Sequence, residues 1–270
     1  MLTAAVLIAA LLAALLFLDA RAFAALVALL VALAGREWGR LARLSPLGAI
    51  AYGIGIALAC VLLGPLAAHL GMTVPPVWSS AALVLAALFW VLIAPLWLNR
   101  GVKPAPALAL CAVGCVVLIP AALAVTALPR LQLLLVLGLV WIADSAAYFA
   151  GRRFGRRKLA PSISPGKTWE GALGGVVGAA LYAIICLALV PAWTGLPLMP
   201  DALLFVAAAI VLCLLSIVGD LLESAVKRQA GVKDSGALLP GHGGLLDRID
   251  STTAVLPVAA LALRLSGLAS

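Results

Sequence analysis

The sequence predicts an all-α protein, a polytopic transmembrane helical bundle of about nine spans. Of its 270 residues, 66% are hydrophobic, and the mean hydropathy is +1.23. Only 10% of the residues are charged, 18 basic and 10 acidic, whereas soluble domains carry about 25%. These proportions exclude a soluble globular enzyme, a disordered chain and a secreted disulfide scaffold.

Nine apolar runs account for the expected spans, since a helix needs about 20 mostly apolar residues to cross a bilayer. The runs cover residues 2–18, 22–34, 47–68, 79–98, 105–127, 131–150, 168–190, 202–222 and 251–268. Because much of the sequence is Ala, which is only weakly apolar, the number of spans could differ from nine by one. The first two runs could instead form a hairpin. A signal peptide ending near residues 20–22 is the alternative for the first run, but no basic segment precedes it.

The loop charges predict the orientation of these spans. Fifteen Lys and Arg residues fall on one side of the membrane, and only Arg21, Arg130 and Arg264 fall on the other. The positive-inside rule then places the amino terminus in the cytoplasm. The same excess accounts for much of the net charge of +8, so we expect no nucleic-acid partner. We expect about five amino-terminal spans in residues 1–130 and a second transmembrane region in residues 131–270, with cytoplasmic loops at 151–168 and 223–250.

The charges are also concentrated, because 16 of the 28 charged residues lie in segments 151–170 and 220–250. Topology requires only Lys and Arg near span ends and does not explain five acidic residues in the second segment. Asp220 and Glu223 are three residues apart at the end of one span, and Asp247 and Asp250 have the same spacing before the last span. Such pairs could converge on a hard cation such as Mg²⁺. Pairing of Glu223 with Lys227 along one helix is the alternative.

A glycine-rich segment, residues 240–244, lies between the two acidic pairs. The backbone N–H groups of Gly243 and Gly244 could approach an anion closely, and Lys227 and Arg228 are near in the sequence. His242 could donate a hydrogen bond to a phosphate; capping a helix or stapling the loop is the alternative role for this residue.

The cationic segment 151–170 offers hydroxyl groups and a lysine, Ser162, Ser164 and Lys167, just before a predicted helix. This combination suits a phosphate-rich substrate. An anchor to anionic lipid headgroups is the alternative for residues 152–158. Asp144 is the one carboxylate inside the apolar run 131–150, and such residues usually face the bundle interior or a polar cavity. We expect it to reach the same site, with a contact to a partner helix as the alternative.

The segment from Ser224 to Asp250, SAVKRQAGVKDSGALLPGHGGLLDRID, resembles the signature of the CDP-diacylglycerol synthases, which are phosphatidate cytidylyltransferases. The matching positions are Ser224, Lys227, Arg228, Lys233, Asp234, Pro240, His242, Gly243, Gly244, Asp247, Arg248 and Asp250. Segments 144–152 and 163–171 are also similar to that family, although Gly166 stands where relatives often have Lys. The first 130 residues match only in hydropathy, and no functional residue is carried over from them.

The resemblance implies that CTP and phosphatidic acid react to give CDP-diacylglycerol and pyrophosphate for phospholipid synthesis. It implies an integral protein of the inner membrane, with its catalytic region facing the cytoplasm, and Mg²⁺ as a cofactor, as two divalent or mixed cations. The sequence leaves a homodimer open. The expected catalytic residues are Asp220, Lys227, Asp247 and Asp250, and the expected metal ligands are Asp220, Glu223, Asp247 and Asp250. The expected substrate-binding residues are Asp144, Ser162, Ser164, Lys167, Ser224, Arg228, Lys233, His242, Gly243, Gly244 and Arg248.

Two other functions fit parts of the pattern. A CTP-dependent lipid kinase would also need acidic pairs and a basic loop, but it would release CDP. An ion-coupled transporter would have charged residues near the membrane midplane and internal repeats. The sequence has only Asp144 within a span and no repeat, which disfavours transport.

Overall fold

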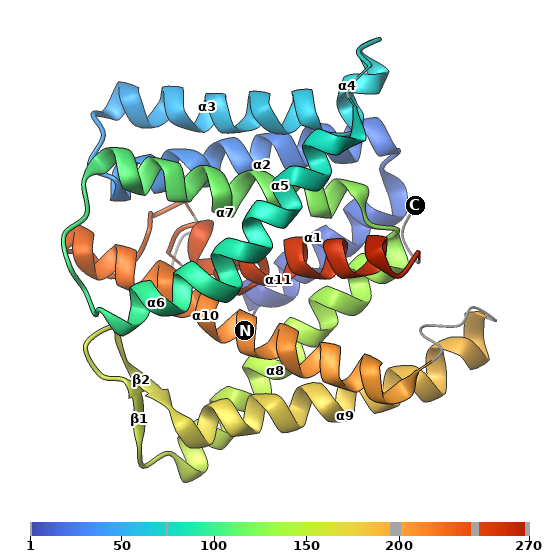
Figure 1. The fold of residues 1–270 in the computed structure, drawn as a ribbon, viewed down its shortest axis with the longest axis vertical. Helices are drawn as coiled ribbons and strands as arrows, with labels where there is room; N and C mark the ends of the chain where they lie inside the picture. Colours follow the sequence, from blue (N-terminus) through green and yellow to red (C-terminus); the bar gives the residue numbers. More distant parts are fainter. Residues whose placement is uncertain (1, 74, 195–200, 239–242, 268–270) are drawn as a thin grey trace.

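The computed structural model describes residues 2–73, 75–194, 201–238 and 243–267 and is a bundle of helices with one small β-hairpin (Figure 1). The amino-terminal helices are α1 (Leu2–Phe17), α2 (Ala20–Leu41), α3 (Pro46–Leu63), α4 (Pro65–His69), α5 (Pro76–Leu88), the π-helix η1 (Phe89–Ile93), α6 (Ala94–Asn99) and α7 (Ala107–Ala127). The carboxyl-terminal elements are α8 (Arg130–Phe154), β1 (Lys158–Ala160), β2 (Ser164–Thr168), α9 (Trp169–Thr194), α10 (Ala202–Ala230) and α11 (Leu246–Leu265).

The predicted all-α membrane fold is confirmed. Among the described residues, seven helical segments are long and apolar enough to cross a bilayer: α2, α3, the continuous stretch Pro76–Asn99, α7, α8, α9 and α10. The expected count of about nine also included α1 and α11. Helix α1 has 16 residues, and α11 carries four charged residues, Asp247, Arg248, Asp250 and Arg264. Neither is therefore among the seven.

Helix α11 lies at the centre of the bundle. It packs against α10, α7, α5, α8 and α2, so that it joins the first helices of the chain to the last ones. Helices α2, α3 and α7 run side by side in Figure 1, and α9 packs along α8 and α10. The charged first turn of α11 is thereby placed beside helices from both halves of the chain.

Glycines permit the close contact between α8 and α9. A Cβ atom at Gly178 would lie 2.6 Å from the Cβ of Ala146, and one at Gly174 would overlap Ala150 and lie 3.1 Å from the Ala146 carbonyl oxygen. Such small residues let helix backbones approach within a membrane, where dispersion contacts hold helices together. This contact fixes Asp144 on α8 relative to the segment that precedes α9.

The segment expected to be a loop at 151–168 is more ordered than predicted. Helix α8 continues to Phe154, and β1 and β2 then pair as an antiparallel hairpin with Lys158 opposite Thr168. At its base, the Glu170 carboxylate accepts backbone hydrogen bonds from Arg156, at 3.0 Å, and Arg157, at 3.2 Å. At its turn, Ile163 is buried against Leu221 and Ala225 of α10. Strands of three and five residues leave too short a pattern for sequence to predict.

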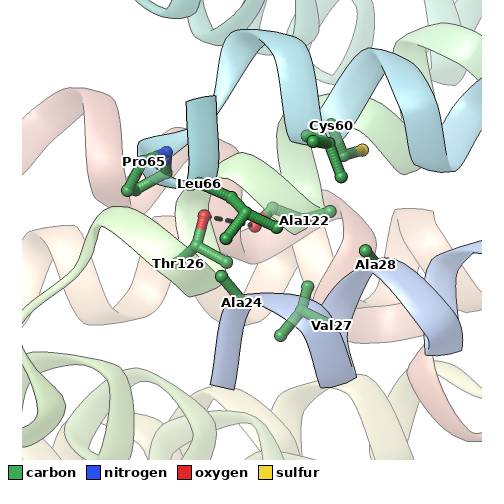
Figure 2. A pocket seen from close by; sticks show the side chains of 9 residues that line it. Ala24, Val27, Ala28, Cys60, Pro65, Leu66, Ala122 and Thr126 are labelled. Carbon is green, nitrogen blue, oxygen red and sulfur yellow. Dashed lines mark hydrogen bonds between the residues drawn. The ribbon is translucent and has the colours of Figure 1, made fainter. Parts of the chain in front are cut away.

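Figure 2 shows a small apolar pocket between α2, α3, α4 and α7, lined by residues such as Val27, Cys60 and Leu66. The hydroxyl of Thr126 is satisfied by donating to the Ala122 carbonyl at 3.1 Å. A volume of about 10 Å³ is scarcely room for one water molecule. This pocket is therefore a packing defect and not a binding site.

We predict that Gly174→Leu will lower the midpoint of thermal unfolding in detergent by several degrees, because the new side chain must displace Ala150 at the α8–α9 contact. Overpacking of this kind costs about 1–3 kcal/mol. Gly55→Leu is the matched control, since nothing lies within 4 Å of a Cβ atom at Gly55. Equal midpoints for the two variants would contradict the role given to this contact.

Candidate active site

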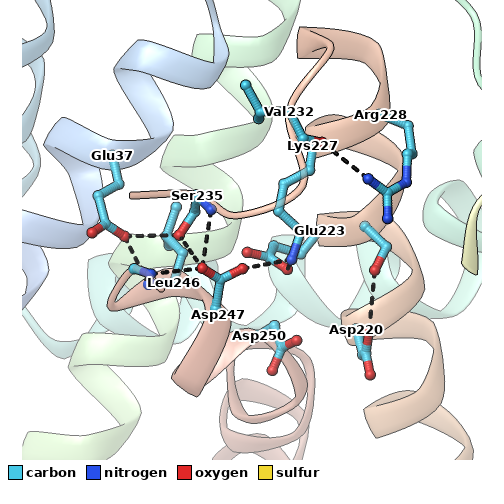
Figure 3. Close-up of polar contacts among 12 residues, drawn as sticks. Glu37, Asp220, Glu223, Lys227, Arg228, Val232, Ser235, Leu246, Asp247 and Asp250 are labelled. Atoms are coloured by element: carbon cyan, nitrogen blue, oxygen red, sulfur yellow. Dashed lines mark hydrogen bonds and ion pairs between the residues drawn. The ribbon is translucent and has the colours of Figure 1, made fainter. Parts of the chain in front are cut away.

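The site is built around the buried ammonium group of Lys227 on α10 (Figure 3). Its Nζ lies 2.6 Å from Glu223 Oε2, one helical turn earlier, and 2.6 Å from Asp247 Oδ1 at the start of α11. The three side chains are 11%, 4% and 9% exposed, respectively. The i,i+4 pairing considered for Glu223 and Lys227 therefore exists, and the same lysine also joins the two acidic pairs.

Asp247 ties the first turn of α11 to the preceding loop. Its Oδ1 accepts the hydrogen bond from Lys227, and its Oδ2 accepts three more. These come from the backbone N–H of Gly244, at 2.7 Å, and from the N–H and hydroxyl of Ser235, both at 3.0 Å. Burial opposes ionisation of Asp247, but Lys227 and these N–H donors outweigh it and lower the pKa of the carboxyl group.

A carboxylate from the amino-terminal half completes this arrangement. Glu37 on α2 accepts hydrogen bonds from the backbone N–H groups of Leu245, at 3.0 Å, and Leu246, at 2.9 Å, and from the Ser235 hydroxyl, at 3.0 Å. No functional residue is expected from the sequence among the first 130 positions, so the place of Glu37 in this arrangement was not predicted. The available signal was its position among Ala34, Trp38 and Leu41, whose spacing marks the buried face of the helix.

The β-hairpin supplies a second lysine to the cluster. Lys167 Nζ on β2 lies 2.6 Å from Asp220 Oδ2 on α10, and both side chains remain partly exposed. The Ser224 hydroxyl donates to the other oxygen of Asp220, at 3.3 Å. The structure thus brings three predicted site residues together.

Together with Asp220, Glu223 and Asp247, the side chains of Asp144 and Asp250 make a cluster of five carboxylates, to which Glu37 does not belong. Asp144 on α8 interacts electrostatically with Asp220, Lys167 and the Ser251 side chain. Asp250 accepts the backbone N–H of Ser251 at 2.8 Å. Burial and the nearby charge of Asp220 raise the pKa of Asp250 to about 7. Lys167 pairs with Asp220, and Lys227 pairs with Glu223 and Asp247, so five carboxylates and two lysines meet in this cluster.

Arg228, a predicted substrate-binding residue, contacts two backbone carbonyl groups. Its Nε donates to the carbonyl of Ile163 in the hairpin turn, at 3.3 Å, and its Nη1 donates to the carbonyl of Val232, at 3.1 Å. These bonds fix the hairpin to the end of α10. Ser162 is exposed and Ser164 is half-buried, and within the described residues neither has a hydrogen bond to the carboxylates.

Gly243 and Gly244, the described residues of the glycine-rich segment, lie against protein carboxylates. Gly243 has φ +79°, the left-handed region that favours glycine, and a Cβ atom there would lie 2.8 Å from Asp247 Oδ2. A Cβ atom at Gly244 would lie 2.6 Å from Glu37 Oε2. His242 lies outside the described residues. Lys233 and Arg248 are exposed, on the segment after α10 and on the first turn of α11.

A cavity of about 490 Å³ extends from this cluster into the bundle. Most of its lining is apolar and comes from α1, α2, α7, α8 and α11, with residues such as Phe23, Leu118 and Leu137. Its polar lining includes four of the predicted site residues: Asp144, Asp247, Arg248 and Asp250. The cavity can therefore take an amphipathic molecule that has a charged head and an apolar body.

The cluster has the donor chemistry of a hard-cation site. Oε1 of Glu223 is buried without a hydrogen-bond partner, whereas Oε2 is ion-paired with Lys227 at 2.6 Å. Asp220 and Asp250 lie close enough for their negative charges to repel each other. Carboxylate oxygens suit Mg²⁺. Across the described residues, however, no three acidic, His or Cys side chains already surround one metal position.

Comparison with known proteins confirms the family resemblance. Residues 1–266 match the profile of the cytidylyltransferase family. A phosphatidate cytidylyltransferase from Pseudomonas aeruginosa is 38% identical over 281 residues, which cover 98% of this chain and 96% of the relative. The proteins of the same name from Haemophilus influenzae and Thermotoga maritima are 50% and 43% identical over 127 and 125 residues. Those two alignments cover 46% of this chain and 43% and 46% of the relatives. The chain therefore belongs to the cytidylyltransferase family.

Proposed function

We propose that this protein transfers the cytidylyl group of CTP to phosphatidic acid, giving CDP-diacylglycerol and pyrophosphate. The observation that carries the proposal is the meeting of five carboxylates and two lysines at one end of an apolar cavity, in a chain of the cytidylyltransferase family. Relatives named phosphatidate cytidylyltransferase support the choice of both substrates.

The cavity suits phosphatidic acid better than a water-soluble acceptor. Its apolar lining would take part of the acyl chains, while Arg248 at the polar end could pair with the lipid phosphate. CTP would approach from the side that carries Lys167 and the hairpin. The excess of Lys and Arg on that side supports a site that faces the cytoplasm, in a protein of the inner membrane.

In the proposed reaction, a phosphate oxygen of phosphatidic acid attacks the α-phosphorus of CTP. The bond between the α-phosphorus and its bridging oxygen to the β-phosphate breaks, and pyrophosphate leaves with that electron pair. A dianionic lipid phosphate has no proton to lose at the attacking oxygen. Phosphoryl-type transfers need mainly positioning and charge stabilisation, so no covalent intermediate with the protein is needed.

Each charged residue has a role in this scheme. Lys167, which is partly exposed, can move from Asp220 to the triphosphate and neutralise it. Lys227 is held by Glu223 and Asp247, so it would act as a fixed positive charge near the reacting phosphates. Ser224 would keep Asp220 oriented through their hydrogen bond.

A cation would offset the negative charge of the carboxylates and of both substrates, which otherwise repel one another. We propose Mg²⁺ as this cation, with Asp220, Glu223 and Asp250 as its chief ligands once they are drawn together, because no three acidic side chains of the described residues already surround one position. The two oxygens of Asp247 already accept four hydrogen bonds, so Asp247 would contribute less directly. When bound, Mg²⁺ would supply Lewis-acid polarisation of the phosphates.

The proposed function predicts where the atoms of CTP will appear. Membranes that contain the protein, incubated with phosphatidic acid and CTP labelled in the base, should yield labelled lipid. Label in the γ-phosphate should appear in pyrophosphate. A γ-phosphate label in the lipid would indicate a lipid kinase instead, and no label of either kind in lipid would contradict a transferase.

We predict that Asp220→Asn will reduce the transfer rate at least about 100-fold, because it removes a charge from the centre of the cluster. The carboxamide keeps the shape of the side chain, so the protein should still insert into membranes. Asp201→Asn is the matched control, because Asp201 caps the opposite end of the same helix. Activity of the Asp220 variant within twofold of the control would exclude Asp220 from the reaction.

Lys167→Ala should raise the apparent KM for CTP about tenfold and leave the KM for phosphatidic acid nearly unchanged. The reason is that Lys167 is the more exposed of the two lysines in the cluster and can reach the triphosphate. Lys158→Ala, on the other strand of the hairpin, serves as the control. The reverse ranking of the two KM effects would assign Lys167 to the lipid.

A further inference from the structure

The carboxylate of Glu37 is buried and therefore needs hydrogen-bond donors from the protein. The residue is only 6% exposed, and burying a carboxylate is costly unless hydrogen bonds replace its lost hydration. Three donors do so: the Ser235 hydroxyl, in the segment after α10, and the N–H groups of Leu245 and Leu246 at the start of α11. Glu37 is separated from these donors by about 200 positions in the sequence, so the contact is purely tertiary.

Two of the donors are backbone N–H groups at the start of α11, where the helix itself offers them no acceptor. The first N–H groups of a helix have no partner within it, and Leu245, at the N-cap position, has no side chain that can accept their hydrogen bonds. Glu37 provides this cap from another helix. A negative charge there also interacts favourably with the helix dipole.

The third donor links Glu37 to Asp247. The Ser235 hydroxyl lies 3.0 Å from Glu37 Oε2 and 3.0 Å from Asp247 Oδ2, so one hydroxyl proton is shared between two carboxylates. Position 236 of the loop has no room for a residue larger than glycine, since a Cβ atom at Gly236 would lie 2.5 Å from Glu37 Oε1. A displacement of the Glu37 carboxylate would therefore move Ser235, and with it Asp247.

We infer that Glu37 is a positioning residue for this site. From the amino-terminal helix α2 it holds both ends of the loop that carries Ser235 and Gly244, and thereby places Asp247 against Lys227. It touches neither Lys227 nor the cavity's reacting end, and acts only through the loop. As an effect on catalysis, this inference rests on the proposed cytidylyl transfer; as an effect on the loop, it does not.

Glu37→Gln tests the inference with little change of volume, because the amide replaces one acceptor oxygen with a donor that faces other donors. We expect kcat to fall about 10- to 100-fold, the range for residues that orient others in a site, with the KM for CTP changed less than about threefold. The amides of Leu245 and Leu246 should exchange hydrogen faster, as measured by mass spectrometry on the full-length protein in detergent.

Trp38→Phe is the matched control on the same helix. It removes the hydrogen bond from the Trp38 indole to the Leu110 carbonyl on α7, at 2.8 Å, and does not involve the loop. This variant should lose thermal stability but keep kcat and the amide exchange of the wild type. Ser235→Ala, which removes only the shared hydroxyl, should lower kcat about three- to tenfold.

Several results would overturn the inference. They are a wild-type kcat for Glu37→Gln, an equal loss of kcat in Trp38→Phe, or a loss of kcat with unchanged exchange at Leu245 and Leu246. If Glu37→Gln does not fold, an unchanged kcat and exchange in Ser235→Ala overturns it. If the wild-type protein forms no CDP-lipid, the proposed function fails, and amide exchange alone then decides the role of Glu37.

Discussion

The site depends on one ion triad, in which the ammonium of Lys227 lies between the carboxylates of Glu223 and Asp247. An unpaired charge in such a buried position is costly, and removing one partner of a buried pair typically costs about 3–5 kcal/mol. The packing of α11 against α10 therefore brings the Asp247 carboxylate to the Glu223–Lys227 pair of α10. The same packing brings Asp220, one turn from Glu223, and Asp250, one turn from Asp247, toward each other.

Asp247 links this triad to the rest of the molecule. It receives Lys227 on one oxygen and the Ser235–Gly244 donors on the other, and Ser235 in turn contacts Glu37 on α2. The hairpin is joined separately, through Lys167 to Asp220 and through Arg228 to Ile163. The cluster is thus held from α2, α10, α11 and the hairpin before any substrate binds, as preorganised catalysis requires.

Hydropathy and charge were sufficient to predict the membrane fold, because crossing a bilayer constrains every span in the same way. The four-residue spacing along one helix was sufficient to predict the ion pair between Glu223 and Lys227. The Lys167–Asp220 pair, the Glu37 cap and the hairpin all depend on how segments distant in the sequence pack, which a single sequence does not encode in local spacing. Gly243 and Gly244 could be recognised as special, but their actual neighbours, the carboxylates of Asp247 and Glu37, could not.

The apolar cavity that ends at Asp144 and Asp250 has a further consequence for the proposed reaction. A lipid bound there need not leave the hydrocarbon layer, and the product keeps the same two acyl chains. The enzyme would then encounter phosphatidic acid by diffusion within the plane of the membrane, and CTP by diffusion through the aqueous solution. Its rate would follow the mole fraction of phosphatidic acid in the bilayer, so diluting the membrane with inert lipid would slow turnover even when the total amount of substrate is constant.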